Sequence, residues 1–107
     1  MRNEMRPIHP GEILREEFLL PLGLTANALA AKLGVPPNRI TLLVREARSV
    51  TADTALRLAR YFGTSPELWL NLQTTFDLRR ADRTSGSAIR KAVKPRQTAD
   101  VRDSQKE

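Results

Sequence analysis

The sequence predicts an all-α fold for one domain, and three observations support this prediction. No stretch alternates apolar and polar residues in the way that a half-buried strand does. The apolar residues recur instead at helical spacing, and Thr, Ser, Pro and Gly stand at positions where helices begin and end. The chain has 107 residues, which is long enough for one modest core and too short for two.

The first of five expected helices lies in "HPGEILREEFLL". We expect it to open after Pro10 and Gly11 and to end at Pro21, because a proline inside a helix removes a hydrogen bond. Glu12 falls in the first turn, where the helix dipole favours an anion. Four apolar residues are expected to be buried on this helix: Ile13, Leu14, Phe18 and Leu20.

The second and third helices are predicted to form a helix-turn-helix. Thr25 is the expected N-cap of "TANALAAKL", and Gly34 ends that helix. Pro36 or Pro37 suits the first turn of the next helix, which we expect to run to about residue 45. The expected core that the pair shares is Leu29, Leu33, Val35, Ile40 and Leu43.

Small residues favour a close crossing of these two helices. Ala30 and Gly34 permit a wide crossing angle with a tight turn between the helices. The second helix of such a pair has its first turn free to enter a DNA groove. The alternative that the spacing leaves open is an ordinary αα-hairpin with a glycine turn.

The fourth and fifth helices each begin with a capping hydroxyl. Thr51 is expected to cap "TADTALRLARYF", with Asp53 in its first turn, and Ser65 to cap "SPELWLNLQTTFDLRRA", with Pro66 at the first helical position. The inner face of the fourth helix is predicted to be Ala55, Leu56, Ala59 and Phe62. On the fifth helix, Leu68, Leu72 and Phe76 form an i, i+4 stripe.

The positive charge is concentrated at the C-terminal end. The whole chain carries +6, of which residues 1–78 contribute only +1 and residues 79–107 contribute +5. Residues 82–107 contain no Leu and no aromatic residue, so we expect a helical domain at residues 1–81 followed by a disordered basic tail at 82–107. Such a tail serves either as a solubilising extension or as a basic arm that grips phosphates or a partner.

Composition alone argues against several functional classes. The chain has no cysteine, which suits a reducing cytosol and leaves no thiolate chemistry, and its longest apolar runs are far too short to span a membrane. His9 is the single histidine, so neither a zinc site nor a Cys-His pair can be assembled. We therefore expect no enzyme activity, no metal, no cofactor and a cytoplasmic protein.

Four stretches carry a resemblance to a known family: "HPGEILREEFL", "LGVPPNRI", "TADTALRLARYFGTSPELWLNLQ" and "FDL". The chain resembles the HigA-type (VapI-like) addiction-module antitoxins, a branch of the lambda-repressor-like, Xre-type helix-turn-helix proteins. The resemblance runs from about Ile8 to Ala81. It implies a five-helix homodimer that represses its own operon by binding double-stranded operator DNA. It also implies that the protein binds and neutralises a RelE-like (HigB-type) mRNA interferase toxin.

The departures from the family pattern fall where DNA would be read. Relatives commonly carry Gly, then Lys or Arg, after the recognition helix, where this chain has Glu46, Ala47 and Arg48. Without that glycine, Glu46 must either take a positive φ or let the helix run on. Leu42 and Ala26 are apolar where relatives tend to have polar side chains.

The expected DNA-binding residues lie mainly on the third helix. Asn38 suits adenine, Arg39 suits guanine or a phosphate, and Thr41 suits a base or a phosphate. Leu42 can contact only a thymine methyl group, and the arginines at the far end of the helix are expected phosphate clamps. The full expected set is Thr25, Pro37, Asn38, Arg39, Thr41, Leu42, Arg45 and Arg48. The alternative for each arginine is a solvated surface charge.

The fifth helix is the expected dimer interface, through Leu68, Trp69, Leu72 and Phe76. The alternative is that Trp69 belongs to the core of its own chain. Two alternative functions also remain open at this point. One is a stand-alone Xre-type transcriptional regulator without a toxin, and the other is a toxin-binding interaction module with weakened DNA binding.

Overall fold

A computed structural model describes residues 6–96 of the chain, and the part it describes is helical without strands. Residues 10–22 form the first helical segment, in which α1 (Pro10–Ile13), the π-helical stretch η2 (Leu14–Leu19) and α2 (Leu20–Leu22) follow without a break. The next segments are α3 (Ala26–Leu33), α4 (Pro37–Val44) and α5 (Ala52–Phe62). The last segment joins α6 (Pro66–Ala81), the π-helical stretch η3 (Asp82–Gly86) and α7 (Ser87–Ala92). The prediction of an all-α fold with a helix-turn-helix is confirmed.

The predicted caps of the later helices are present. The side-chain oxygens of Thr25, Thr51 and Ser65 accept hydrogen bonds from backbone N–H groups in the first turns of α3, α5 and α6. Gly34 and Gly63 take the left-handed conformation that ends α3 and α5. Pro36 is the N-cap residue of α4 and Pro37 its first helical residue.

The first helix differs from the prediction at Pro21, which does not end it. The π-helical turn before it carries the bond from the Leu20 N–H to the Arg15 carbonyl, and this looser turn accommodates a proline ring. Gly23, with φ of 62°, ends the helix instead. The same π spacing places Leu19, five residues after Leu14, on the buried side, whereas Leu20 is 70% exposed. The expectation that Leu20 is buried was therefore wrong.

Two further expectations need correction. Leu56 of α5 is exposed, because the buried side of that helix follows Ala55, Leu58 and Ala59 at i, i+3 and i+4. Residues 82–92, expected to be disordered, are helical. Nothing ends the helix at residue 81, and Arg90 pairs with Asp82 over 3.0 Å across the intervening turns. Residues 97–107 of the expected tail lie outside the described residues.

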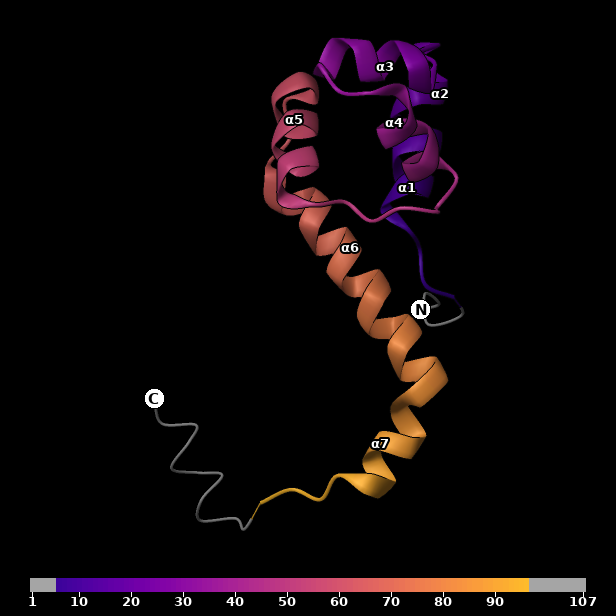
Figure 1. Cartoon of the computed structure of the whole chain (residues 1–107), viewed down its shortest axis with the longest axis vertical. Coiled ribbons are helices and arrows are strands. Elements are labelled where there is room, and N and C mark those ends of the chain that lie inside the picture. The colour runs from indigo at the N-terminus through magenta and orange to yellow at the C-terminus, as the bar shows by residue number, and fades with distance from the viewer. Residues whose placement is uncertain (1–5, 97–107) are drawn as a thin grey trace.

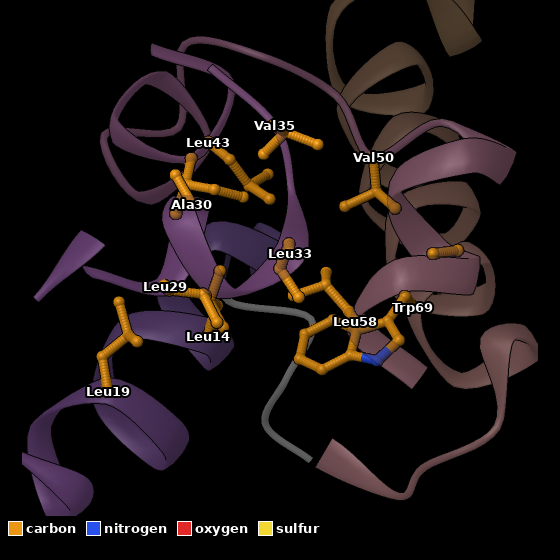
Figure 2. Packing of buried hydrophobic residues seen from close by; sticks show 12 residues of the cluster. Leu14, Leu19, Leu29, Ala30, Leu33, Val35, Leu43, Val50, Leu58 and Trp69 are labelled. Carbon is orange, nitrogen blue, oxygen red and sulfur yellow. The ribbon is translucent and has the colours of Figure 1, made fainter. Parts of the chain in front are cut away.

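The core lies between the first four helical segments and the start of α6. Figure 2 shows Leu33 and Leu58 beside the Trp69 ring, with Leu14, Leu19 and Leu29 on the opposite side of the cluster. All five residues predicted to be shared by α3 and α4 are buried. In Figure 1, α6 leaves this bundle and continues into α7, which lies away from the other helices. None of the described helices is long and apolar enough to cross a membrane.

Candidate nucleic-acid interface

The helix-turn-helix gives α4 one buried side and one open side. Ile40 and Leu43 are buried, since they anchor α4 against α3 and the first helix. The remaining residues of α4 and its cap face outward to different degrees. Pro37, Asn38 and Arg45 are exposed, and Thr41 and Leu42 are half-buried. Asn38, Thr41, Leu42 and Arg45 recur at i, i+3, i+4 and i+7, so they share one side of the helix.

Arg39 is not a free surface charge, because its Nη1 donates to Oδ2 of Asp53 over 2.6 Å. The same oxygen accepts from Nε of Arg57 over 2.8 Å, and Nη1 of Arg57 donates to the Leu33 carbonyl over 2.8 Å. The two arginines lower the pKa of the Asp53 carboxyl, Arg57 most strongly. The sequence shows the i, i+4 pair of Asp53 and Arg57, but nothing in it joins this pair to Arg39.

The end of α4 is held by a side chain that the sequence analysis did not single out. Glu46 has φ of 64°, which confirms the positive-φ alternative. Arg15, from the first helix, donates through Nη1 to the carbonyl of Val44, and its Nη2 lies 3.6 Å from Oε2 of Glu46. Glu46 therefore takes the conformation that a glycine would supply, while Arg15 satisfies a carbonyl at the helix end and partly neutralises the Glu46 carboxylate.

The other expected DNA-binding residues are placed around α4. Thr25 is exposed, and its hydroxyl caps α3 by accepting from the Ala28 N–H over 3.0 Å. It lies with Ala26, Arg15 and Val44 around a shallow hollow at the start of α3. Arg48 is exposed in the loop after α4 and lines a separate polar hollow with Ser49 and Arg80. Thr25 and Arg48 therefore line two separate hollows.

His9 and Gly11 hold the first helix against the end of α4. His9 is buried and acts as the N-cap of α1, its Nδ1 accepting from the Gly11 N–H over 2.9 Å. Burial lowers the pKa of the His9 imidazole. A Cβ on Gly11 would lie 1.8 Å from the Leu43 carbonyl oxygen, so only glycine fits there. Neither role was predicted from the sequence: the Gly11 contact depends on the approach of Leu43 across the fold, whereas the His9 cap is a local contact that the sequence could have shown.

The loop after α4 is tied to α6 by a buried amide. Oε1 of Gln73 accepts from the Val50 N–H over 2.8 Å, and its Nε2 donates to Oδ1 of Asp77 over 3.0 Å. Buried backbone groups need such partners. Gln73 therefore fixes where the chain goes after the helix-turn-helix.

The residues expected at a dimer interface differ in how far they are buried. Trp69 has no exposed area, its Nε1 donates to the Thr64 hydroxyl over 2.9 Å, and its ring packs on Phe18. It belongs to the core of its own chain, the alternative that the sequence left open. Leu72 and Phe76 are half-buried, and Leu68 is 38% exposed. In the described part of the chain, no cluster of three acidic or histidine side chains is suited to a metal ion.

A family model described as helix-turn-helix matches residues 14–69, which places the molecule in that class of DNA-binding fold. Virulence-associated protein I of Dichelobacter nodosus is 59% identical over 86 residues, 80% of each chain. A solved addiction module antidote protein of a HigA family from Coxiella burnetii is 56% identical, with a TM-score of 0.81 over 85% of this chain and 99% of that chain. The Pseudomonas aeruginosa antitoxin HigA, solved with the higBA promoter, is 45% identical, with a TM-score of 0.83 over the same shares. The chain belongs to the HigA-type family of helix-turn-helix antitoxins, which confirms the resemblance in its sequence.

Proposed function

We propose that the chain is the antitoxin of a type II toxin–antitoxin module and represses its own operon by binding double-stranded operator DNA. One observation carries the DNA-binding part: α4 keeps its open side, with Asn38, Thr41 and Arg45 on one face and Arg39 beside it. The solved relative that contains promoter DNA has a similar fold over most of this chain. Amide, hydroxyl and guanidinium groups are those that read base edges and bind phosphates.

The proposed protein partner is a RelE-like, HigB-type mRNA interferase. Support comes from the relatives named as antitoxins or antidote proteins, and not from a surface that we assign to the toxin. The proposal gives the chain no catalytic step. Operator DNA and a ribosome-dependent toxin both belong to the cytoplasm, so the chain is expected there.

The test of the antitoxin role is growth rescue. The toxin gene is the RelE-like reading frame that the proposal expects beside the gene, and it is induced alone or together with this chain. We expect arrest of growth with the toxin alone and recovery when both are produced. No recovery, at antitoxin levels confirmed by immunoblot, would remove the toxin from the proposal and leave the stand-alone regulator.

We further propose that the chain binds DNA as a homodimer, since two recognition helices about one DNA turn apart read a near-palindrome. Leu68, Leu72 and Phe76 remain as candidate contacts on α6, while Trp69 belongs to the core. Sedimentation equilibrium at micromolar protein is expected to give twice the chain mass. A monomeric mass would contradict the dimer.

A second function is favoured by a specific observation. Leu42 is half-buried in the middle of the open face, and Glu46 places a carboxylate at its end. Both features weaken contact with DNA. They favour a toxin-binding module that has kept the helix-turn-helix shape with reduced operator affinity.

A further inference from the structure

We infer that Asp53 is a positioning residue for DNA reading, because it fixes the direction of the Arg39 guanidinium beside the open face of α4. The inference rests on the proposed DNA binding and adds to it a residue that lies outside the helix-turn-helix. It also assigns Arg57 the task of holding Asp53 in place.

The contacts form a chain across three helices. Arg57, from the second turn of α5, donates to the last carbonyl of α3 at Leu33 and to Oδ2 of Asp53. Asp53, in the first turn of α5, in turn accepts from Nη1 of Arg39 in the first turn of α4. Both helices of the helix-turn-helix are thus connected to the start of α5. A rotation of α4 relative to α3 would break this chain.

The geometry leaves Arg39 able to bind DNA while it is held. Its bond to Asp53 uses Nη1, and it is the one hydrogen bond that the described part of the structure gives this guanidinium. A guanidinium has five N–H donors in a planar fork, so donors remain for a base edge or a phosphate. Asp53 also accepts from Nε of Arg57, so its carboxylate has a second partner besides Arg39.

The ion pairs of Asp53 with Arg39 and Arg57 contribute little to the free energy of folding. The Asp53 side chain is 55% exposed, and ion pairs that face solvent contribute little to folding. Their effect is to reduce the rotamers of a long side chain before it binds, which lowers the entropy that binding must overcome. Removal of the Asp53 charge is therefore expected to change DNA recognition and to leave the fold intact.

The experiment compares Asp53→Asn with a matched control, Glu67→Gln. Glu67 occupies the same position of α6 that Asp53 has in α5, the second residue after the N-cap. Within the described residues it makes no ion pair. Each variant loses one negative charge, so both share the general gain in attraction to DNA.

Affinity is measured by fluorescence anisotropy on duplex from the gene's own upstream region and on a scrambled duplex. The specificity ratio is the affinity for the upstream duplex divided by the affinity for the scrambled duplex. Asp53→Asn is expected to lower this ratio by about tenfold. Glu67→Gln is expected to leave the ratio unchanged. In an Arg39→Gln background, Asp53→Asn should have no further effect on the ratio, because Asp53 acts through Arg39.

Three results would overturn the inference. One is an equal effect of Asp53→Asn and Glu67→Gln on the ratio, and another is a further loss in the Arg39→Gln background. The third is a higher ratio for Asp53→Asn, which would mean that Asp53 withholds Arg39 from DNA. A wild-type chain with no preference for its upstream duplex would instead contradict the proposed function, and the inference with it.

The ion pair is also tested without DNA, by NMR of the Arg39 guanidinium in the free protein. Restricted rotation about its Nε–Cζ bond is expected in the wild type and in Glu67→Gln, with faster rotation in Asp53→Asn. Equally fast rotation in all three would overturn the inference whatever the DNA measurements give.

Discussion

At the residue scale, much of the organisation around α4 depends on side chains that make contact only after folding. His9 caps the first helix, Gly11 allows that helix to touch Leu43, and Arg15 binds the end of α4. Gly11 and Arg15 join the "HPGEILREE" stretch to the helix-turn-helix, and His9 joins it to α6 through the Phe76 ring. The first helix therefore acts as the support of the recognition helix.

The stability of the fold is expected to depend on pH because His9 is buried as a helix cap. Burial lowers its pKa in the folded chain from about 6.5, and protonation of Nδ1 would remove the bond from the Gly11 N–H. Below about pH 6.5 the unfolded chain therefore binds more protons than the folded chain. The free energy of unfolding should be constant above that pH and fall as the pH decreases toward 5. Urea unfolding at pH 7.5, 6 and 5 measures this.

The control for His9 is His9→Asn, because asparagine caps helices and does not titrate. Its stability should be the same from pH 7.5 to pH 5. A parallel decrease in both proteins would show that other groups cause the pH dependence.

Gly11→Ala is expected to destabilise the fold by about 1–3 kcal/mol. The added methyl group would meet the backbone carbonyl of Leu43, which no side-chain rotation can relieve. Gly86→Ala is the comparison, since its methyl group would meet the exposed side chain of Asp82 in a helix. Thermal unfolding of both is the measurement. Equal stability of Gly11→Ala and the wild type would contradict the close contact.

At the element scale, the turn that follows α4 contains a strained residue, Glu46. Glu46→Gly is expected to raise the free energy of unfolding by about 1 kcal/mol, because glycine takes a positive φ without steric cost. The exposed ion pair with Arg15 that is lost contributes little. Glu46→Gln removes the charge and keeps the strain, so it should match the wild type in urea unfolding. A less stable Glu46→Gly would mean that the Arg15 contact outweighs the strain.

The open face of α4 gives a prediction about affinity. Leu42 can offer DNA only an apolar contact, whereas an arginine there adds a charged donor. Leu42→Arg should therefore bind the upstream duplex about tenfold more tightly. Gel-shift titration measures the change, with Leu56→Arg on the exposed side of α5 as a control for added charge. An unchanged specific affinity in Leu42→Arg would show that this position does not face the groove.

At the scale of the whole molecule, local signals in the sequence were sufficient for the fold. Thr25, Thr51 and Ser65 cap helices through bonds to residues three positions ahead, and such bonds depend on nearby sequence alone. The buried face of α3 and α4 follows helical spacing in the same way. The all-α helix-turn-helix was therefore predictable.

The failures of prediction have physical causes that the sequence does not display. The π-helical turn changes the spacing in the first helix, which moved burial from Leu20 to Leu19. The helix continues through residues 82–92 although little of it is buried, so the absence of Leu and aromatic residues was a poor guide there. The shared open side of α4 followed from helical spacing. Its supports at Arg15, Asp53 and Gln73 were not predictable, because their partners lie more than ten residues away.

The most direct test of the central claim is the salt dependence of binding to the upstream duplex and to a scrambled duplex. Fluorescence anisotropy of the purified full chain gives both affinities across a salt series. A helix that reads bases should prefer the upstream duplex by a factor of about a thousand or more. Equal and steeply salt-dependent affinities for the two duplexes would contradict the account, because they would mean that basic side chains bind phosphates alone.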